Sequence, residues 1–336
     1  MKHIIFGGDG FVGRHLAPKL VADGHEVIVA DIVKSPLAHY GKAAFVQCDV
    51  TRPEDIAALG IRGDDMVYNL SAKMLSPLQV RAKRHDFFYP VNFHGTENII
   101  HAMDKAGAPN LVHFTTDMIY GHTVMTPMTE DHPVAPLGEY GMSKWETELL
   151  AHKWREKGMN ISLFRPRLII GPGRLGILSK LFKLIDMNLP VPMIGSGRNP
   201  YQFISVFDCA EAARAAFKAG VPNEAYNLGS LNPPPVKKLL GDLIKHAGSK
   251  SILIPTPGWA VKRTLDLLDW MNMPIMDPEQ YLIADEECIL DVSKGERELG
   301  WVPQYRDEDM LNAAYTEYRA KLDGKASPAG AQVPAE

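Results

Sequence analysis

The sequence predicts an α/β protein with a doubly wound parallel sheet and a smaller, partly interleaved α/β region towards its C-terminal end. Short apolar runs alternate with helical patterns, the runs are rich in Val, Ile and Leu, and the first run leads directly into glycines. This alternation is typical of βαβ units. The expected strands of the first half are His3–Phe6, Glu26–Ala30, Ala44–Gln47, Met66–Leu70, Leu111–Phe114 and Ile161–Phe164.

The frequency of glycine and proline rises after Arg165, and we take this change as a division of the chain. We expect a first domain over residues 1–165 and a second, looser one over residues 166–322, because glycines and prolines such as Pro233–Pro235 break the later sequence into short pieces. Phe203–Val206 and Ala225–Leu228 resemble strands that return to the first sheet. Residues 323–336 are rich in Ala, Pro, Gly and Ser, which predicts a disordered tail.

The composition favours an ordinary globular protein. Of 336 residues, 46% are hydrophobic and 23% charged, and the formal charge is −4, with Lys and Arg too scattered to form a nucleic-acid footprint. Three separated cysteines indicate a reducing compartment, and the absence of HExxH and CxxC patterns gives no support for a metal. With no signal-peptide pattern and no apolar run of transmembrane length, we expect a cytoplasmic protein without a transmembrane segment.

The glycines after the first strand form the pattern GxxGxxG at Gly7, Gly10 and Gly13. Between a strand and a helix, such glycines permit a tight turn, close approach of a pyrophosphate and close helix packing, which predicts a dinucleotide-binding Rossmann domain. The alternative is a plain glycine turn. Asp31 closes the second strand, where a carboxylate binds ribose hydroxyls and repels a 2′-phosphate, so NAD is favoured over NADP. Lys34 weakens this preference.

A second group of residues predicts proton and hydride chemistry. Tyr140 and Lys144 are four residues apart in the expected helix Glu139–Lys157, so they share one face. An ammonium beside the phenol would lower its pKa from about 10 and make the tyrosine a proton shuttle. Thr116 follows a predicted strand at the sheet edge where ligands bind, so its hydroxyl can bond the reacting oxygen.

These residues together resemble the extended short-chain dehydrogenase/reductase superfamily, including the NAD-dependent epimerase/dehydratase family. The resemblance covers nearly the whole chain. It is carried by Gly7–Gly13, Asp31, Asp49-Val50, Asn69–Ala72, Val91-Asn92, Gly95-Thr96, Thr116, Tyr120-Gly121, Tyr140 with Lys144, Arg165-Pro166, Gly171-Pro172, Ser205–Asp208, Asn227–Gly229 and Asp291–Trp301.

The resemblance implies NAD as cofactor and assigns roles to individual residues. The implied catalytic residues are Thr116, Tyr140 and Lys144. The implied cofactor-binding residues are Gly7, Gly10, Phe11, Val12, Gly13, Asp31, Asp49, Val50, Leu70, Ser71, Ala72, Tyr140, Lys144 and Pro166. The implied substrate-binding residues are Thr116, Asp117, Met118, Arg167 and Tyr201. Asp49 has an alternative reading as the cap of a helix over Thr51–Leu59.

Departures from the family pattern narrow the chemistry. Family dehydratases carry an Asp-Glu pair after the threonine, whereas this chain has Asp117 and Met118, and methionine cannot transfer a proton. Dehydration and glutamate-dependent decarboxylation are therefore disfavoured. Arg167 stands where nucleotide-sugar enzymes usually carry asparagine, and Tyr201 where they carry arginine. Phosphate contacts remain open through Arg167, Arg174 and Arg198.

Three functions are weighed for a small-molecule substrate. The first is an oxidoreductase-type isomerase, an epimerase of nucleotide-activated or lipid-linked sugars that works by transient hydride transfer at a secondary alcohol. The second is a hydroxysteroid-like or other hydrophobic secondary-alcohol dehydrogenase. The third is an NAD-binding protein without catalysis.

Three further expectations concern surfaces. The apolar segment from Trp259 to Met273 is predicted to cover the core of the second domain, with a lipid-substrate lid as the alternative. Arg81–Tyr89 is predicted to be a solvated loop, with a substrate flap as the alternative. The resemblance implies a homodimer that pairs the helices over Asn92–Lys105 and Tyr140–Trp154. Ile99, Ile100 and Met103 suit either that interface or packing on the sheet.

Overall fold

The computed structural model describes residues 1–35, 40–174, 176 and 178–324. From residue 325 on, the expected disordered tail lies outside the described residues. Within these ranges, no helix is both long enough and apolar enough to cross a membrane.

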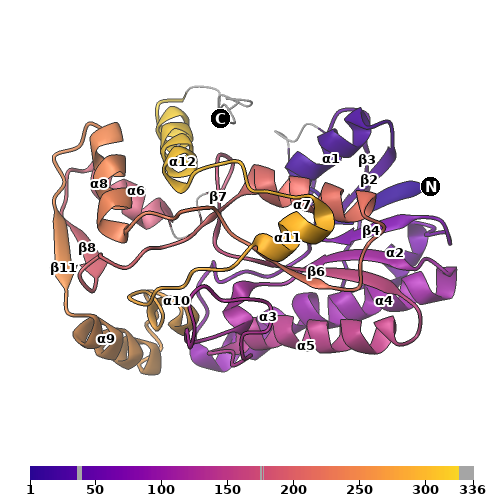
Figure 1. The fold of residues 1–336 in the computed structure, drawn as a ribbon, viewed down its shortest axis with the longest axis horizontal. Helices are drawn as coiled ribbons and strands as arrows, with labels where there is room; N and C mark the ends of the chain where they lie inside the picture. Colours follow the sequence, from indigo (N-terminus) through magenta and orange to yellow (C-terminus); the bar gives the residue numbers. More distant parts are fainter. Residues whose placement is uncertain (36–39, 175, 177, 325–336) are drawn as a thin grey trace.

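Seven of the described strands form one parallel sheet in the order β10-β6-β5-β4-β1-β2-β3 (Figure 1). The order reverses between β1 and β4, and sheets of this kind bind ligands at the carboxyl ends of the strands beside such a reversal. The doubly wound fold and its first six strands are confirmed. The strands are β1 (Lys2–Phe6), β2 (Glu26–Asp31), β3 (Ala44–Gln47), β4 (Met66–Asn69), β5 (Asn110–Phe114), β6 (Asn160–Pro166) and β10 (Ala225–Leu228).

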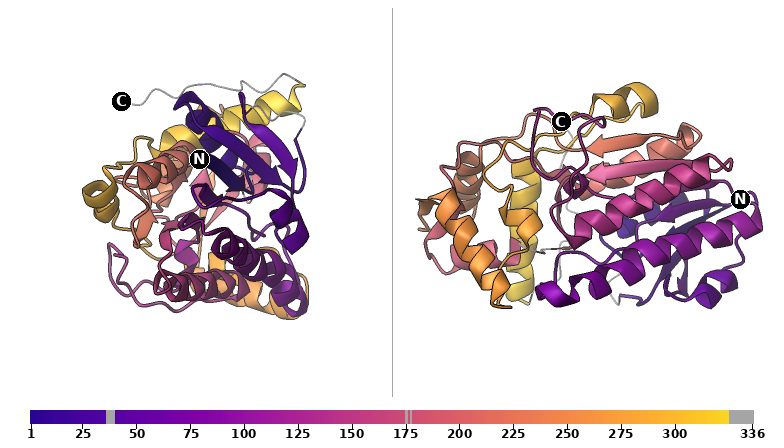
Figure 2. Two further views of the ribbon diagram at one scale, coloured as in Figure 1. Left: turned by 90° about the vertical axis from the view of Figure 1, so that its right-hand side faces the viewer. Right: turned by 90° about the horizontal axis from the view of Figure 1, so that it is seen from below.

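Helices cover both faces of the sheet. α1 (Gly13–Ala22) and α7 (Val206–Lys218) pack on one face. α2 (Pro53–Ala58), α4 (Gly95–Ala106) and α5 (Glu139–Arg155) pack on the other, where Figure 2 shows α4 and α5 side by side. The cofactor loop and the predicted catalytic helix therefore lie on opposite faces and meet at the sheet edge.

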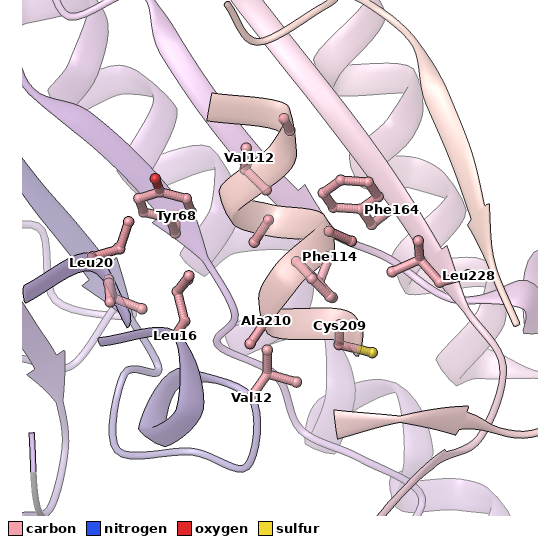
Figure 3. Close-up of a cluster of buried hydrophobic side chains, with 14 of the residues drawn as sticks. Val12, Leu16, Leu20, Tyr68, Val112, Phe114, Phe164, Cys209, Ala210 and Leu228 are labelled. Carbon is pink, nitrogen blue, oxygen red and sulfur yellow. The ribbon is translucent and has the colours of Figure 1, made fainter. Parts of the chain in front are cut away.

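The core under α7 depends on small side chains. Figure 3 shows Cys209 and Ala210 of α7 beside Val112, Phe114 and Phe164 of the strands. Alanines let the helix approach the sheet closely, so that buried atoms on both sides stay in contact. The buried alanines of α7 are Ala210, Ala212, Ala213 and Ala216.

On the opposite face, three side chains of α4 were expected either to form a dimer interface or to pack on the sheet. Ile99, Ile100 and Met103 are fully buried in a cluster that includes Ala151 and Trp154 of α5. They pack on the sheet and are not available to a dimer interface.

A second core lies in the C-terminal half. α6 (Leu178–Asp186), α8 (Val236–His246) and α12 (Asp307–Leu322) enclose the fully buried Phe182. Beside them, β8 (Val191–Ile194) pairs in parallel with β11 (Leu253–Thr256). This unit stands apart from the large sheet (Figure 1).

One expectation for the second half of the chain is wrong. Phe203–Val206 does not return to the large sheet, because β9 (Ile204–Ser205) pairs with β7 (Ile169–Ile170) in a separate two-stranded sheet. The Ser205 hydroxyl then accepts a hydrogen bond from the Phe207 N–H at 3.1 Å and caps α7. An N-capping serine ends the strand at this point.

The chain does return to the large sheet elsewhere. β10 pairs with β6, and α11 (Ser293–Leu299) packs against α7 and β10. Just after α11, the Trp301 indole N–H donates to the Asp208 carbonyl at 3.0 Å. The two halves are therefore interleaved.

The prediction of a solvated loop over Arg81–Tyr89 is also wrong. Residues 81–83 form a 3₁₀ turn and α3 spans Arg84–Tyr89. The buried Arg84 guanidinium forms ion pairs with Asp269 and with Asp277, the latter at 3.5 Å. These contacts with residues far along the chain hold the segment as a helix, and no local sequence pattern reveals them.

The apolar segment over Trp259–Met273 departs from expectation as well. α9 (Gly258–Trp270) does not cover the core, because Trp259 and Trp270 are exposed. Among the described side chains of α9, Asp269 is the buried one. Val261, Leu265 and Leu268 are only partly buried.

Candidate active site

A cavity of about 350 Å³ opens at the carboxyl ends of the strands, between the sheet and segments of the C-terminal half. It joins twelve predicted site residues that are distant in sequence: Gly7, Phe11, Val12, Leu70, Ala72, Thr116, Asp117, Met118, Tyr140, Lys144, Pro166 and Arg167. A larger hollow of about 440 Å³ between α6, α8 and α12 contains none of the predicted residues.

The glycine loop forms a cradle that larger residues would fill. Gly7 has a φ of +69°, and a Cβ there would lie 2.7 Å from the Ser71 backbone nitrogen. A Cβ at Gly10 would lie 2.8 Å from the Gly7 carbonyl oxygen, and one at Gly13 would lie 2.5 Å from the Gly8 carbonyl oxygen. Gly10 and Gly13 do not line the cavity but bring α1 against the loop. This geometry fits a pyrophosphate at a helix N-terminus.

Asp31 ends β2 beside this loop. Its carboxylate accepts hydrogen bonds from the backbone N–H groups of Asp9 at 2.9 Å and Ile32 at 2.8 Å. A carboxylate accepts up to about four hydrogen bonds, so capacity remains for ribose hydroxyls. Burial raises the pKa of Asp31, and these two backbone bonds oppose the rise. Asp31 does not line the 350 Å³ cavity, which lies towards the nicotinamide end of the predicted cofactor path.

Asp49, Val50 and Ser71 also lie outside the cavity lining. The Asp49 carboxylate accepts from the Thr51 N–H at 2.9 Å and hydroxyl at 2.8 Å, in the turn before α2. Val50 is buried in the core. Ser71 donates its N–H to Asn69 Oδ1 at 3.1 Å, which orders the strand end. The role of Asp49 at the adenine stays a prediction.

Thr116, Tyr140 and Lys144 are all buried and line the same cavity. Lys144 Nζ donates to the Phe114 carbonyl at 3.0 Å, and the Tyr140 hydroxyl donates to Met74 Sδ at 3.5 Å. Thr116 Oγ1 accepts from the Met118 N–H at 3.2 Å. α5 and the end of β5 therefore bring the predicted catalytic side chains to one place.

The pKa of Tyr140 differs from the expectation that Lys144 lowers it. Burial raises the pKa of the Tyr140 phenol, and the interaction with the Thr116 hydroxyl opposes the rise. Burial also lowers the pKa of Lys144 to about 8, with Glu148 acting in the opposite sense. In the protein alone, Lys144 thus does not bring the pKa of Tyr140 below its ordinary value. Desolvation dominates because both groups are enclosed.

Arg167 and Asp117 form a buried ion pair in the cavity wall. The Arg167 guanidinium carbon lies 5.1 Å from the centre of the Tyr201 ring, so Tyr201 supports Arg167 from outside the lining. Among the described residues, Arg167 Nη2 has no hydrogen-bond partner although it is buried. A buried donor of this kind can bind a polar substrate group. Arg174 lines the cavity too, whereas Arg198 does not.

A buried polar network anchors α5 to the sheet. Arg165 Nη2 lies 2.6 Å from Glu148 Oε2, and its Nη1 donates to the Tyr120 hydroxyl at 2.9 Å. Tyr120 in turn donates to Asn227 Oδ1 at 2.6 Å, and Thr115 donates to Glu148 Oε1 at 2.6 Å. Several motifs that carried the family resemblance therefore meet in one structural network.

No sequence pattern indicates the contact made by Glu279 of α10 (Pro278–Tyr281). Its carboxylate accepts from the Tyr140 N–H at 2.9 Å and the Gly141 N–H at 2.8 Å. A Cβ at Gly138 or Gly141 would lie 2.6 Å or 2.7 Å from the Glu279 oxygens. Glu279 thus caps α5 from 139 residues away, where the N-cap residue Gly138 has no side chain to do so.

Other lining residues were also missed. The segment after β4 contributes Met74, Leu75, Ser76 and Leu78, and the C-terminal half contributes Ser179, Lys180, Ile275, Met276 and Gln280. They carry no motif, and only the tertiary fold brings them to the cavity. In the described residues, no cluster of His, Cys, Asp and Glu suits a metal ion.

The cap predicts a specific loss of stability. Glu279→Ala leaves two buried N–H groups without acceptors, so unfolding in urea should require about 1–3 kcal/mol less than in the wild type. Glu279→Gln keeps one acceptor and should lie between the two. Glu139→Ala, which removes a charge from the same helix end but no cap, is the control. Equal losses in both alanine variants would contradict the capping role.

The same cap should titrate. Burial, followed by the charge of Asp277, raises the pKa of Glu279 from 4.5 to about 8. A pKa that is raised in the folded state means that the folded protein favours the protonated carboxyl of Glu279. The free energy of unfolding that this preference contributes is complete below pH 4.5 and is lost as pH rises through about 8. Wild-type stability should therefore fall more steeply over this window than that of Glu279→Gln, as measured by urea unfolding at each pH.

Comparison with known proteins agrees with this geometry. The family model described as the NAD dependent epimerase/dehydratase family matches residues 3–229. Over 98% of this chain and 96% of the other protein, the sequence is 25% identical to a 3-beta-hydroxysteroid dehydrogenase of Mycolicibacterium neoaurum. It is 27% identical to an N-acetyl-alpha-D-glucosaminyl-diphospho-ditrans,octacis-undecaprenol 4-epimerase of Escherichia coli O157:H7, over 67% of this chain and 66% of that protein.

The fold has close structural counterparts. The UDP-glucuronic acid 4-epimerase of Bacillus cereus, solved in complex with NAD, superposes with a TM-score of 0.77 at 21% identity, over 97% of this chain and 99% of the other. The expectations of an NAD-dependent enzyme and of the extended short-chain dehydrogenase/reductase fold are confirmed. The chain belongs to the NAD-dependent epimerase/dehydratase family.

Proposed function

We propose that this chain is an NAD-dependent sugar epimerase that oxidises and re-reduces one secondary alcohol of an activated sugar. Residues 1–165 would hold NAD and the catalytic side chains, and residues 166–322 would bind the sugar and its carrier. The observation that carries the proposal is the convergence of Thr116, Tyr140 and Lys144 in one enclosed cavity beside the glycine loop. The proposed place of action is the cytoplasm.

The residue after Asp117 supports epimerisation over dehydration. Met118 lines the cavity next to Thr116, where a water-eliminating enzyme needs a proton-transferring group. Asp117 is engaged in its buried ion pair with Arg167, which leaves it poorly placed to act as an acid. A cycle that only removes and returns hydrogen fits these side chains.

Each residue of the trio has a defined role. Bound NAD supplies the acceptor and donor of a hydride. Tyr140 takes the hydroxyl proton while the carbon loses the hydride, and it returns that proton when the hydride is delivered to the opposite face. Thr116 holds the reacting oxygen by a hydrogen bond. Lys144 binds the nicotinamide ribose, and its charge favours the phenolate once the site is filled.

The proposed substrate is an activated sugar with a polar group at Arg167. Proteins similar to this chain include a putative UDP-glucose 4-epimerase and an epimerase of a lipid-linked sugar, so both carriers fit the proposal. The unpartnered Arg167 Nη2 would bind a hydroxyl or an anionic oxygen of the sugar, and Arg174 at the cavity wall would meet the diphosphate.

A second candidate, a dehydrogenase of hydrophobic alcohols, is favoured by one observation. Leu75, Leu78, Ile275 and Met276 make much of the cavity wall apolar, and one relative is a 3-beta-hydroxysteroid dehydrogenase. Such an enzyme releases reduced cofactor in each cycle, whereas an epimerase returns the hydride before release.

Cofactor retention and product analysis distinguish these candidates. Freshly purified protein should contain tightly held NAD, and incubation with UDP-glucose, UDP-N-acetylglucosamine or a polyprenyl-diphosphate sugar should give the C4 epimer by NMR without net NADH. Continuous NADH formation from a steroid alcohol, with no epimer from any sugar, would contradict the proposal.

Tyr140→Phe should lower kcat by about 10²–10⁴ with NAD binding nearly unchanged, because it removes the proton acceptor and keeps the buried ring. Thr116→Val should cost less, since it removes one hydrogen bond. Lys144→Met should lower both kcat and NAD affinity. Stopped assays and calorimetric titration measure these effects. Wild-type turnover in Tyr140→Phe would exclude the mechanism and reopen the NAD-binding protein without catalysis.

The homodimer is proposed to pair α4 and α5 with those of a second copy. Met142 and Leu149 are seven residues apart on α5 and expose apolar atoms on that side. Leu149→Arg should shift the protein from dimer to monomer in analytical ultracentrifugation, whereas Leu322→Arg on α12 should not. A wild type that is monomeric at micromolar concentration would contradict this interface.

A further inference from the structure

The tyrosine of the proposed mechanism stands in the first turn of its helix. α5 begins at Glu139, so Tyr140 is its second residue, whereas Lys144 lies about one turn further along. The first N–H groups of a helix have no acceptor within the helix, and the side chain at the N-cap usually supplies one. Gly138 at the N-cap has no such side chain. The position of Tyr140 therefore depends on a group from elsewhere in the chain.

That group is the buried carboxylate of Glu279, which accepts from the Tyr140 N–H at 2.9 Å and from the Gly141 N–H at 2.8 Å. The fit at the N-cap is close. A Cβ at Gly138 would lie 2.6 Å from Glu279 Oε1, and the three heavy atoms nearest to that Cβ all belong to Glu279. The glycine thus leaves the room that the carboxylate occupies.

The segment around Glu279 is tied to a second element that contacts the tyrosine. The Glu279 N–H donates to Asp277 Oδ1 at 3.1 Å, and Asp277 Oδ2 lies 3.5 Å from Arg84 Nε of α3. α3 also carries Phe88, whose ring packs edge-on against the Tyr140 ring with the ring centres 5.6 Å apart. Tyr140 is therefore held through its backbone by Glu279 and through its ring by a helix that pairs with the same segment.

The same segment forms part of the cavity wall. Ile275, Met276 and Gln280 line the cavity together with Tyr140. Glu279 itself does not line it, although Gln280 follows directly in sequence. One short stretch of chain thus contacts the start of α5 with one side chain and the substrate space with the next. The contact made by Glu279 fixes the distance between this wall and the tyrosine.

Lys144 does not depend on this contact. Its ammonium donates to the Phe114 carbonyl at 3.0 Å, and the ion pair between α5 and β6 anchors the helix one turn later. Loss of the Glu279 carboxylate should therefore loosen Tyr140 and leave Lys144 in place. The rate of the proton transfer and the affinity for NAD should then respond differently.

We propose that Glu279 is a positioning residue of the reaction, which holds Tyr140 at the substrate from the C-terminal half of the chain. It acts through the tyrosine and does not touch the reacting atoms. The proposal rests on the proposed function in one respect, that Tyr140 is the proton acceptor. It applies equally to an epimerase and to a dehydrogenase.

Kinetics and cofactor binding test this role. Glu279→Ala should lower kcat about 10- to 100-fold, because a displacement of about 1 Å at a reacting group can cost about 10²-fold. Glu279→Gln keeps one acceptor and should lie between Glu279→Ala and the wild type. The Kd of NAD, measured by calorimetric titration, should stay within about twofold in both variants.

A matched control removes a cap from another helix. Asp291 Oδ1 accepts from the Ser293 N–H at 2.7 Å at the start of α11, and no residue of α11 lines the cavity. Asp291→Ala should lower the stability of the protein in urea, as Glu279→Ala does, and keep the kcat of the wild type. A loss of kcat that follows stability in both variants would contradict positioning.

Two double-variant cycles locate the effect. The backbone at Gly138 is extended, so Gly138→Ala is tolerated there and its methyl group displaces the carboxylate. Gly138→Ala should lower kcat in the wild type and have little further effect in Glu279→Ala, because the contact is already lost. Likewise, Glu279→Ala should have little effect on the residual kcat of Tyr140→Phe. Additive losses in either cycle would overturn the proposal.

Amide hydrogen exchange gives a readout without substrate. In Glu279→Ala, exchange should become faster at Tyr140 and Gly141 and stay unchanged at Lys144. Unchanged exchange at Tyr140 would overturn the proposal whether or not a sugar is converted. Faster exchange at Tyr140 with wild-type kcat would overturn it too. A wild type that converts no sugar and no alcohol would refute the proposed function, and exchange alone would then decide whether Glu279 holds the tyrosine.

Discussion

The buried ion pair between Glu148 and Arg165 fixes the helix that carries the proposed catalytic residues. Glu148 lies one turn after Lys144, and its carboxylate meets Arg165 on β6, whose guanidinium also binds Tyr120. Separating this pair would leave an uncompensated charge in the interior, which costs several kcal/mol, so α5 has one favourable position on the sheet. The placement of Tyr140 beside the cofactor loop follows from this constraint.

Much of the fold and of the site was predictable from the sequence, for local reasons. Apolar runs such as Val27–Val29 predict buried parallel strands. Glycine is required at positions 7, 10 and 13 because a Cβ there would lie less than 3 Å from backbone atoms of the loop or of the next strand end. Tyr140 and Lys144 share a helix face whatever the rest of the chain does. The topology of a doubly wound sheet then places Thr116 near them, because strand ends meet at one edge.

Several of the wrong or missing predictions involve long-range contacts. Arg81–Tyr89 is a helix because Arg84 finds Asp269 on α9, 185 residues later. The apolar pattern of α9 suggested a helix that covers the core, yet Trp259, Leu267 and Trp270 are exposed. Glu279 has no neighbours in sequence that mark it. Apolar periodicity indicates which side of a helix is apolar, and it does not indicate what that side contacts.

Gly138 and Gly141 at the start of α5 limit how this chain can be recombined with its relatives. Both are small because a carboxylate from the second half of the chain fits against them. A chimera that joined residues 1–165 to the second half of another enzyme would keep Gly138 and Gly141 but lose the Glu279 carboxylate that lies against them. The helix would then begin with bare N–H groups beside the reacting atoms. The two halves are therefore exchangeable only as a matched pair.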